Sequence, residues 1–261
     1  MSVTVTNPAT RLSPVAESQS PFAPRKNAAF AERKATEAER KAREERRRAR
    51  SYPISRWYLR PAAGYLARLL APTTVRPVHL TACGLVAAAC AAAVLIWLPE
   101  AMPTAAALIL TAWLLDRADG QLARLQHTAS AFGAWLDANV DELIDLGLHV
   151  AVAQTAAALS GSSLPWFLLI GFLVGKYLLM YGLAVEEARG PAGPDTAAER
   201  TTWLRRAWHL PGNADVRVHL LAAGVLTGWL TAELALVAAY YNLRWVARYG
   251  LVARRLGGAP R

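Results

Sequence analysis

Long apolar stretches separated by short polar segments dominate the chain from residue 79 onward. A helix that crosses a membrane needs about 20 predominantly apolar residues. Six stretches approach that length, of which the second is short and the last two are nearly continuous: 79–98, 102–118, 133–158, 164–186, 216–232 and 233–252. The pattern therefore predicts an all-α fold, namely an integral membrane bundle of six helices.

A different pattern precedes the first of these stretches. Between Ile54 and Leu70, tryptophan, tyrosine and leucine are interleaved with Arg56, Arg60 and Arg68. Helices of this mixed character commonly lie in the membrane interface. We therefore expect an N-terminal amphipathic interfacial helix that leads the chain into the bilayer.

The first 52 residues are polar and basic. Residues 1–25 have a composition typical of disorder, whereas 27–50 predict a charged helix without an apolar stripe. Its surplus arginines either contact anionic lipid headgroups or are simply solvated, and both interpretations stay open. No apolar core of a secretory signal is present in this tail. We expect a cytoplasmic tail over 1–52, a six-span domain over 53–255 and a C-terminal tail over 256–261.

Composition supports a membrane protein, because the chain is 54% hydrophobic yet has a net charge of +10. Apolar and basic residues must then be segregated along the chain, as they are. The two cysteines, Cys83 and Cys90, share one apolar helix, where packing is expected and a disulfide is geometrically disfavoured. Neither cysteine nor histidine shows zinc-ligand spacing.

The distribution of arginine predicts the topology. The connections Pro99–Pro103, Ser160–Pro165 and Thr231–Glu233 contain no lysine or arginine. Arginines gather on the opposite side: Arg117, Arg124, Arg189, Arg200, Arg205, Arg206, Arg217, Arg254 and Arg255. The positive-inside rule then predicts an inner cell membrane protein with both termini in the cytoplasm.

Four aspartates cluster where the second span ends and the third begins. Asp116 and Asp119 are three residues apart, and Asp137 and Asp141 are four apart, so each pair shares one helix face. Converging carboxylates at membrane depth must take up protons or be neutralised by cations. Carboxylate oxygens suit Mg²⁺ or Mn²⁺, which also bind diphosphate oxygens. The alternative is that the acids cap helices or pair with nearby arginines.

The same segment resembles the signature of the CDP-alcohol phosphatidyltransferase family. That signature is Asp, two residues, Asp-Gly, two residues, Ala-Arg, eight residues, Gly, three residues, Asp, three residues and Asp. Every place is filled, by Asp116, Asp119, Gly120, Ala123, Arg124, Gly133, Asp137 and Asp141. The likeness extends over roughly residues 53–255, including a weaker match at 76–81, and leaves the basic tail outside.

The resemblance implies a function and roles for these residues. Asp116, Asp119 and Asp137 would hold the metal, and Asp141 would be a further ligand and the general base. The CDP-binding positions would be Asp116, Asp119, Gly120, Ala123, Arg124 and Gly133. The enzyme would move a phosphatidyl group from CDP-diacylglycerol to a polar alcohol, with or without a phosphate, and release CMP. Family members are commonly homodimers.

Four further ionisable residues are candidates for binding the acceptor or a phosphate: Asp145, Lys176, Arg217 and Arg244. Charged residues within membrane spans are functional candidates by default. Lys176 and the arginine-rich stretch that ends at Arg217 favour a phosphorylated acceptor. The alternatives are snorkelling, or structural pairing with Asp145 or Glu186.

The sequence is also compatible with other functions. Within the family, a CDP-choline or CDP-ethanolamine type of phosphotransferase would use the lipid as acceptor. A family member without catalysis would serve as a membrane lipid-binding protein. A transporter or channel would distribute its acids over several spans and depths, whereas these acids lie at one membrane face. We expect membrane lipids and no nucleic acid among the partners.

Overall fold

The computed structural model describes residues 53–188 and 212–257. Within these ranges, every regular element is helical. Its elements are η1 (Ser55–Trp57), α2 (Leu59–Leu70), α3 (Pro77–Trp97), η2 (Pro99–Ala101), α4 (Met102–Leu125), α5 (Ala131–Ser160), α6 (Leu164–Ala188), α8 (Ala214–Thr227) and α9 (Leu230–Gly257). The predicted all-α class is confirmed for these ranges. The predicted basic tail and its helix lie outside the described residues, and the domain boundaries stay predictions.

Each predicted span overlaps mainly with a different helix, but the fifth, 216–232, extends beyond the end of α8 at Thr227 into the first residues of α9. Three of these helices are long and apolar enough to cross a membrane: Pro77–Trp97, Ala131–Ser160 and Leu164–Glu186. The others differ because α4 carries two aspartates and two arginines, α8 has only 14 residues, and α9 contains Glu233 and several arginines. The count of six spans and the orientation of the termini therefore stay predictions.

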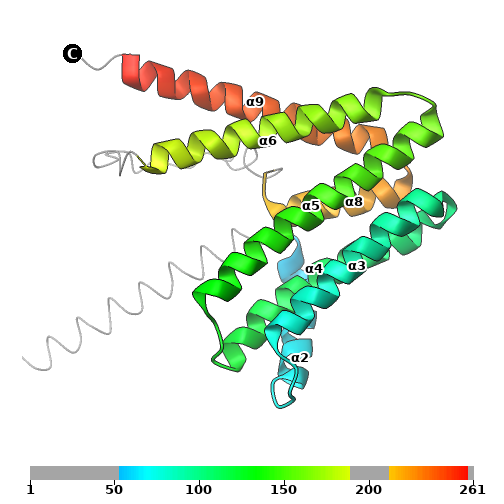
Figure 1. Cartoon of the computed structure of the whole chain (residues 1–261), viewed down its shortest axis with the longest axis vertical. Coiled ribbons are helices and arrows are strands. Elements are labelled where there is room, and N and C mark those ends of the chain that lie inside the picture. Colours follow the sequence, from blue (N-terminus) through cyan, green and yellow to red (C-terminus); the bar gives the residue numbers. More distant parts are fainter. Residues whose placement is uncertain (1–52, 189–211, 258–261) are drawn as a thin grey trace, which may run out of the picture. The chain divides into compact units, whose positions relative to one another are not determined.

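The helices pack in two groups that α5 connects (Figure 1). In one group α4 packs against α2, α3 and α8, and in the other α6 lies along α9. Helix α5 contacts α3, α6 and α9. Fully buried small residues such as Ala91, Ala105 and Ala153 line the shared core, and small side chains let membrane helices approach closely. Because α5 contacts helices of both groups, side chains on successive turns of α5 can contact either group.

Helix α2 is two-sided. Ala63 and Ala67 are fully buried and belong to a small core with α4, whereas Trp57, Tyr65 and Leu69 near or on the helix are exposed. This distribution agrees with an interfacial helix. Its position at a membrane surface stays a prediction.

Asp215, fully buried at the start of α8, fixes the segment before α2. Its Oδ2 accepts hydrogen bonds from the backbone N–H groups of Ile54 (2.8 Å) and Ser55 (2.9 Å), and its Oδ1 accepts one from the Trp113 indole (3.2 Å). Burial opposes ionisation, but these hydrogen bonds hold the pKa of Asp215 below its ordinary value. One carboxylate thus ties the lead-in segment to α4 and α8.

Helices α6 and α9 approach closely at Gly175. A β-carbon there would lie 2.8 Å from Nδ2 and 2.9 Å from the backbone nitrogen of Asn242. Since the backbone of α9 cannot rotate away, we expect Gly175→Ala to lower the free energy of unfolding by about 1–3 kcal/mol. Thermal unfolding in detergent, followed by circular dichroism, measures the loss. Gly147→Ala is the matched control, because nothing lies within 4 Å of its added β-carbon, and equal losses would contradict the prediction.

Candidate active site

The site begins in the second half of α4, where Asp116 and Asp119 project from one side of the helix. Asp119 is only 4% exposed, and its Oδ2 accepts a 2.6 Å hydrogen bond from Thr81 Oγ1 on α3. Burial raises the pKa of Asp119 to about 7; the Thr81 hydrogen bond opposes this shift, and the nearby Asp116 and Asp137 add to it. A neighbouring cation would favour the ionised carboxylate.

A short connection, residues 126–130, turns the chain from α4 into α5. Gln126 Nε2 donates to the Val75 carbonyl at 2.9 Å and so holds the end of α4 against the segment before α3. Helix α5 begins after Ser130, whose Oγ accepts a 3.0 Å hydrogen bond from the Gly133 N–H group. Gly133 of the signature thus lies in the capped first turn of α5, one turn before Asp137.

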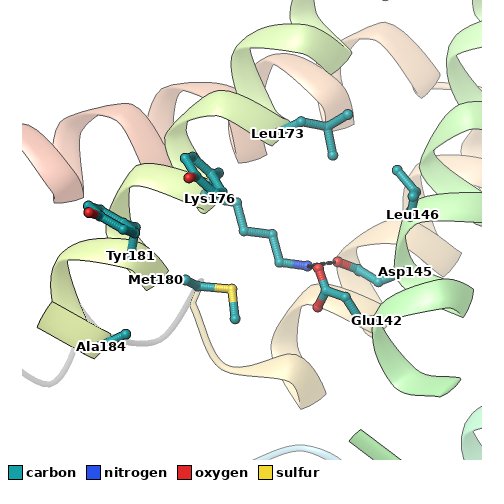
Figure 2. Close-up of a pocket in the computed structure, with 9 residues that line it drawn as sticks. Glu142, Asp145, Leu146, Leu173, Lys176, Met180, Tyr181 and Ala184 are labelled. Atoms are coloured by element: carbon teal, nitrogen blue, oxygen red, sulfur yellow. Dashed lines mark hydrogen bonds and ion pairs between the residues drawn. The ribbon is translucent and has the colours of Figure 1, made fainter. Parts of the chain in front are cut away.

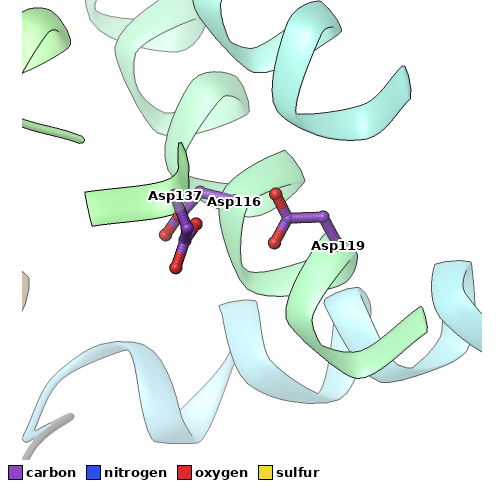
Figure 3. Close-up of side chains that lie close together, drawn as sticks. All are labelled: Asp116, Asp119 and Asp137. Atoms are coloured by element: carbon purple, nitrogen blue, oxygen red, sulfur yellow. The ribbon is translucent and has the colours of Figure 1, made fainter. Parts of the chain in front are cut away.

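Asp116, Asp119 and Asp137 converge as their spacing predicts (Figure 3). Each offers one carboxylate oxygen, and these three oxygens lie within 4.8 Å of one another. Asp141, one turn further along α5, interacts electrostatically with Asp137 and Asp116. Hard oxygen ligands so close together fit a divalent cation such as Mg²⁺ or Mn²⁺, which would relieve their mutual repulsion. Which metal binds stays a prediction.

Arg117 pairs with one member of this cluster. Its Nε donates to Asp116 Oδ2 at 2.7 Å, and its guanidinium lies 4.1 Å from the centroid of the Trp113 ring. The arginine pairing that we considered as an alternative to a metal site is therefore present at Asp116. The Arg117–Asp116 pair and the carboxylate cluster coexist, because one oxygen each of Asp116, Asp119 and Asp137 still lie within 4.8 Å of one another.

The glycine and arginine of the signature follow on the same helix. Arg124 Nη1 lies 3.7 Å from the point that a β-carbon on Gly120 would occupy. A β-carbon at Gly120 would therefore meet the Arg124 guanidinium at an ordinary van der Waals distance. Ala123 is half-buried and Arg124 is exposed. Contacts of these residues with a cytidine nucleotide stay predictions.

A second cluster lies one turn beyond Asp141, around the buried Asp145. Asp145 Oδ2 is 2.5 Å from Lys176 Nζ of α6, and its Oδ1 accepts a 2.9 Å hydrogen bond from Arg217 Nε of α8. Lys176 Nζ also lies 2.7 Å from Glu142 Oε1. The structure thus brings together three of the four acceptor candidates, and it shows the structural pairing of Lys176 with Asp145.

The fourth candidate, Arg244, lies on α9 and donates a 2.6 Å hydrogen bond to the Tyr240 hydroxyl on the same helix. Glu186, considered as a partner for these cations, instead pairs with Arg248 at 2.8 Å. Glu142 is the residue that sequence reasoning missed. It directly follows Asp141, but its contact with Lys176 depends on how α5 and α6 pack.

A pocket of about 470 Å³ lies between α5 and α6 beside the second cluster (Figure 2). Its polar wall consists of Glu142, Asp145 and Lys176, and the rest of its lining is largely aliphatic and aromatic. Asp145, which lines the pocket, lies one helical turn beyond Asp141 on α5. Together with the apolar helices, these features define a membrane protein whose site suits phosphate chemistry.

Comparison with known proteins identifies the family to which this membrane protein belongs. Residues 74–253 match the family model described as CDP-alcohol phosphatidyltransferase. Because the match covers more than half of the chain, the protein belongs to the CDP-alcohol phosphatidyltransferase family. The resemblance seen in the aspartate signature is thereby confirmed. Members are membrane transferases of phospholipid biosynthesis and depend in general on divalent metals.

Two relatives illustrate the likeness. The bifunctional IPC transferase and DIPP synthase of Aquifex aeolicus is 28% identical over 144 residues, covering 55% of this chain but only 32% of that protein. The chain thus spans about a third of that relative's length. The crystal structure of Mycobacterium tuberculosis phosphatidylinositol phosphate synthase, with CDP-DAG bound, is similar with a TM-score of 0.55 and 22% identity. This structural similarity covers 73% of this chain and 93% of the synthase chain. It supports the helical fold described above.

Proposed function

We propose that the protein transfers a phosphatidyl group from CDP-diacylglycerol to a polar alcohol and releases CMP. The observation that carries this proposal is the convergence of Asp116, Asp119 and Asp137, whose carboxylate oxygens lie within 4.8 Å of one another. The similar mycobacterial synthase was crystallised with CDP-DAG bound, which supports a CDP-linked lipid as donor.

The aspartate cluster would bind the metal and the donor. Asp116, Asp119 and Asp137 would hold Mg²⁺ or Mn²⁺, with Asp141 as a further ligand. The bound metal supplies positive charge that neutralises the diphosphate and the departing CMP. The positions proposed to line the CDP site are Asp116, Asp119, Gly120, Ala123, Arg124 and Gly133. Arg124 suits a phosphate, because its planar guanidinium can donate two parallel hydrogen bonds.

Asp141 acts as the general base in this proposal. Its carboxylate takes the proton of the acceptor hydroxyl, and the hydroxyl oxygen attacks the phosphorus of the phosphatidyl group. A new phosphorus–oxygen bond forms, and the bond to the cytidylate oxygen breaks, so that CMP departs with the electron pair. The pocket walls, with Asp145, Lys176 and Arg217 nearby, hold the acceptor, and Arg244 is a further candidate on α9.

The location of the site fits these substrates. A lipid donor arrives from the bilayer, whereas the alcohol and CMP exchange with water, so a site near the membrane surface serves both. In this proposal the termini and the site face the cytoplasm, and the protein is a homodimer of the cell membrane.

The first experiment measures CMP release by the purified full-length protein with CDP-diacylglycerol and Mg²⁺. The acceptors are inositol, inositol phosphate, glycerol phosphate and serine, with a reaction lacking acceptor. We expect acceptor-dependent CMP release that Asp137→Ala lowers about 100-fold or more, because the metal site loses a ligand. Asn139→Ala is the matched control on α5, since within residues 53–188 and 212–257 its side chain hydrogen-bonds to the Trp135 carbonyl of the same helix. No release with any acceptor, repeated with CDP-choline and diacylglycerol, would contradict the proposal.

A further inference from the structure

Glu142 lies in the wall of the pocket between α5 and α6 and pairs with the buried cation there (Figure 2). Its Oε1 is 2.7 Å from Lys176 Nζ, and the side chain of Glu142 is 54% exposed whereas that of Lys176 is 9% exposed. Lys176 Nζ also lies 2.5 Å from Asp145 Oδ2. Within the described pocket lining, the ammonium group therefore has two carboxylates as neighbours.

The second cation near the pocket is paired as well. Arg217 Nε donates to Asp145 Oδ1 at 2.9 Å, and its Nη1 donates to the Tyr241 hydroxyl at 2.7 Å. Two cations, Lys176 and Arg217, thus face two carboxylates, Asp145 and Glu142. Among the residues that the structure describes, these four charges sum to zero, and both oxygens of Asp145 are in use.

This balance disfavours an anionic acceptor. A phosphate group carries about −1.5 to −2 charges at neutral pH. At Lys176 it would lie close to the negative charges of Glu142 and Asp145, which already accept from two of the three ammonium N–H groups. An alcohol without phosphate meets no such repulsion, because its hydroxyl groups can donate hydrogen bonds to the same carboxylates.

We propose that the pocket selects an acceptor alcohol that carries no phosphate, and that Glu142 sets this selectivity by occupying Lys176. The inference rests on the proposed transfer to an alcohol and names the class of that alcohol. It reverses the sequence-based expectation that Lys176 and Arg217 favour a phosphorylated acceptor. That expectation treated both cations as available to a phosphate, whereas in the structure Lys176 and Arg217 are both paired with carboxylates.

The transfer test compares matched acceptors, glycerol with glycerol 3-phosphate and inositol with inositol 1-phosphate, by kcat/KM for CMP release. We expect the wild type to favour the unphosphorylated member of each pair by about tenfold or more. Glu142→Gln keeps the size of the side chain and removes its charge. It should reduce this preference about tenfold by raising kcat/KM for the phosphorylated acceptor. A wild type that prefers phosphorylated acceptors, or an unchanged ratio in Glu142→Gln, would overturn the proposal.

Two control variants test whether the acceptor preference depends on the negative charge at Glu142 or on the total charge of the protein. Glu142→Asp keeps the negative charge and should keep the preference. Glu186→Gln removes the same charge from α6, where Glu186 pairs with Arg248 away from the pocket lining, and should leave the ratio unchanged. If Glu186→Gln changed the ratio as much as Glu142→Gln, the selectivity could not be assigned to Glu142.

A binding measurement tests the same idea without catalysis. Isothermal titration calorimetry with glycerol 3-phosphate, in the absence of donor, should show about tenfold tighter binding to Glu142→Gln than to the wild type. The double variant with Lys176→Gln should lose that gain. Equal binding by the wild type and Glu142→Gln would refute charge selection. If no acceptor released CMP while the gain in binding appeared, the proposed transfer would be wrong and the charge selection would stand.

Discussion

Asp141→Asn is expected to lower the rate of CMP release by about 100- to 10,000-fold, the usual contribution of a general base. Asparagine has nearly the same shape as aspartate but cannot take the proton of the acceptor hydroxyl. Asp116, Asp119 and Asp137, the three carboxylates that offer oxygens within 4.8 Å of one another, remain intact in this variant. The affinity for the CDP-linked donor should therefore stay close to that of the wild type.

Two measurements on the same preparation test this expectation. Single-turnover CMP release gives the chemical step, and equilibrium binding of CDP-diacylglycerol in nanodiscs with Mg²⁺ gives the donor affinity. Asn139→Ala on the same helix controls for disturbance of α5, because its side chain donates a hydrogen bond to the Trp135 carbonyl of its own helix. Parallel losses of rate and donor affinity in Asp141→Asn would identify Asp141 as mainly a metal ligand.

The aspartate cluster could be predicted from the sequence because its geometry is mostly local. Helical periodicity alone puts Asp116 with Asp119, and Asp137 with Asp141, on one face each. The short connection between α4 and α5 then brings the two faces together. The all-α class could be predicted equally well, since a long apolar stretch within a membrane satisfies its backbone hydrogen bonds by forming a helix.

The second cluster could be predicted only in part, as the alternative pairing of Lys176 with Asp145, because its members come from three helices. Pairing of Asp145 with Lys176 and Arg217 depends on how α5, α6 and α8 pack, and periodicity carries no information on that packing. The same holds for the buried His149, whose Nε2 lies 3.4 Å from Glu233 Oε1 of α9. Sequence analysis considered Asp145 as a partner of the cations only as an alternative and did not identify Glu142, and so favoured an anionic ligand.

Replacement of Asp145 should have the largest effect on stability. The carboxylate is buried and holds two cations from different helices, Lys176 at 2.5 Å and Arg217 at 2.9 Å. Asp145→Asn keeps the size of the side chain but leaves the guanidinium of Arg217 with a neutral amide and the Tyr241 hydroxyl. Loss of one partner of a buried ion pair typically costs about 3–5 kcal/mol, so we expect a loss of unfolding free energy of that order.

Glu186→Gln provides the matched contrast, because Glu186 and Arg248 form an ion pair whose side chains are 33% and 35% exposed. Solvent screens such a pair, and its loss should cost about 0–1 kcal/mol. Denaturant unfolding in detergent micelles, followed by tryptophan fluorescence, compares both variants. Arg217→Gln added to Asp145→Asn removes the unpaired charge and should recover part of the loss. If the two single variants lost equal stability, or the second substitution brought no recovery, the Asp145 pairs would not hold α5, α6 and α8 together as their buried contacts indicate.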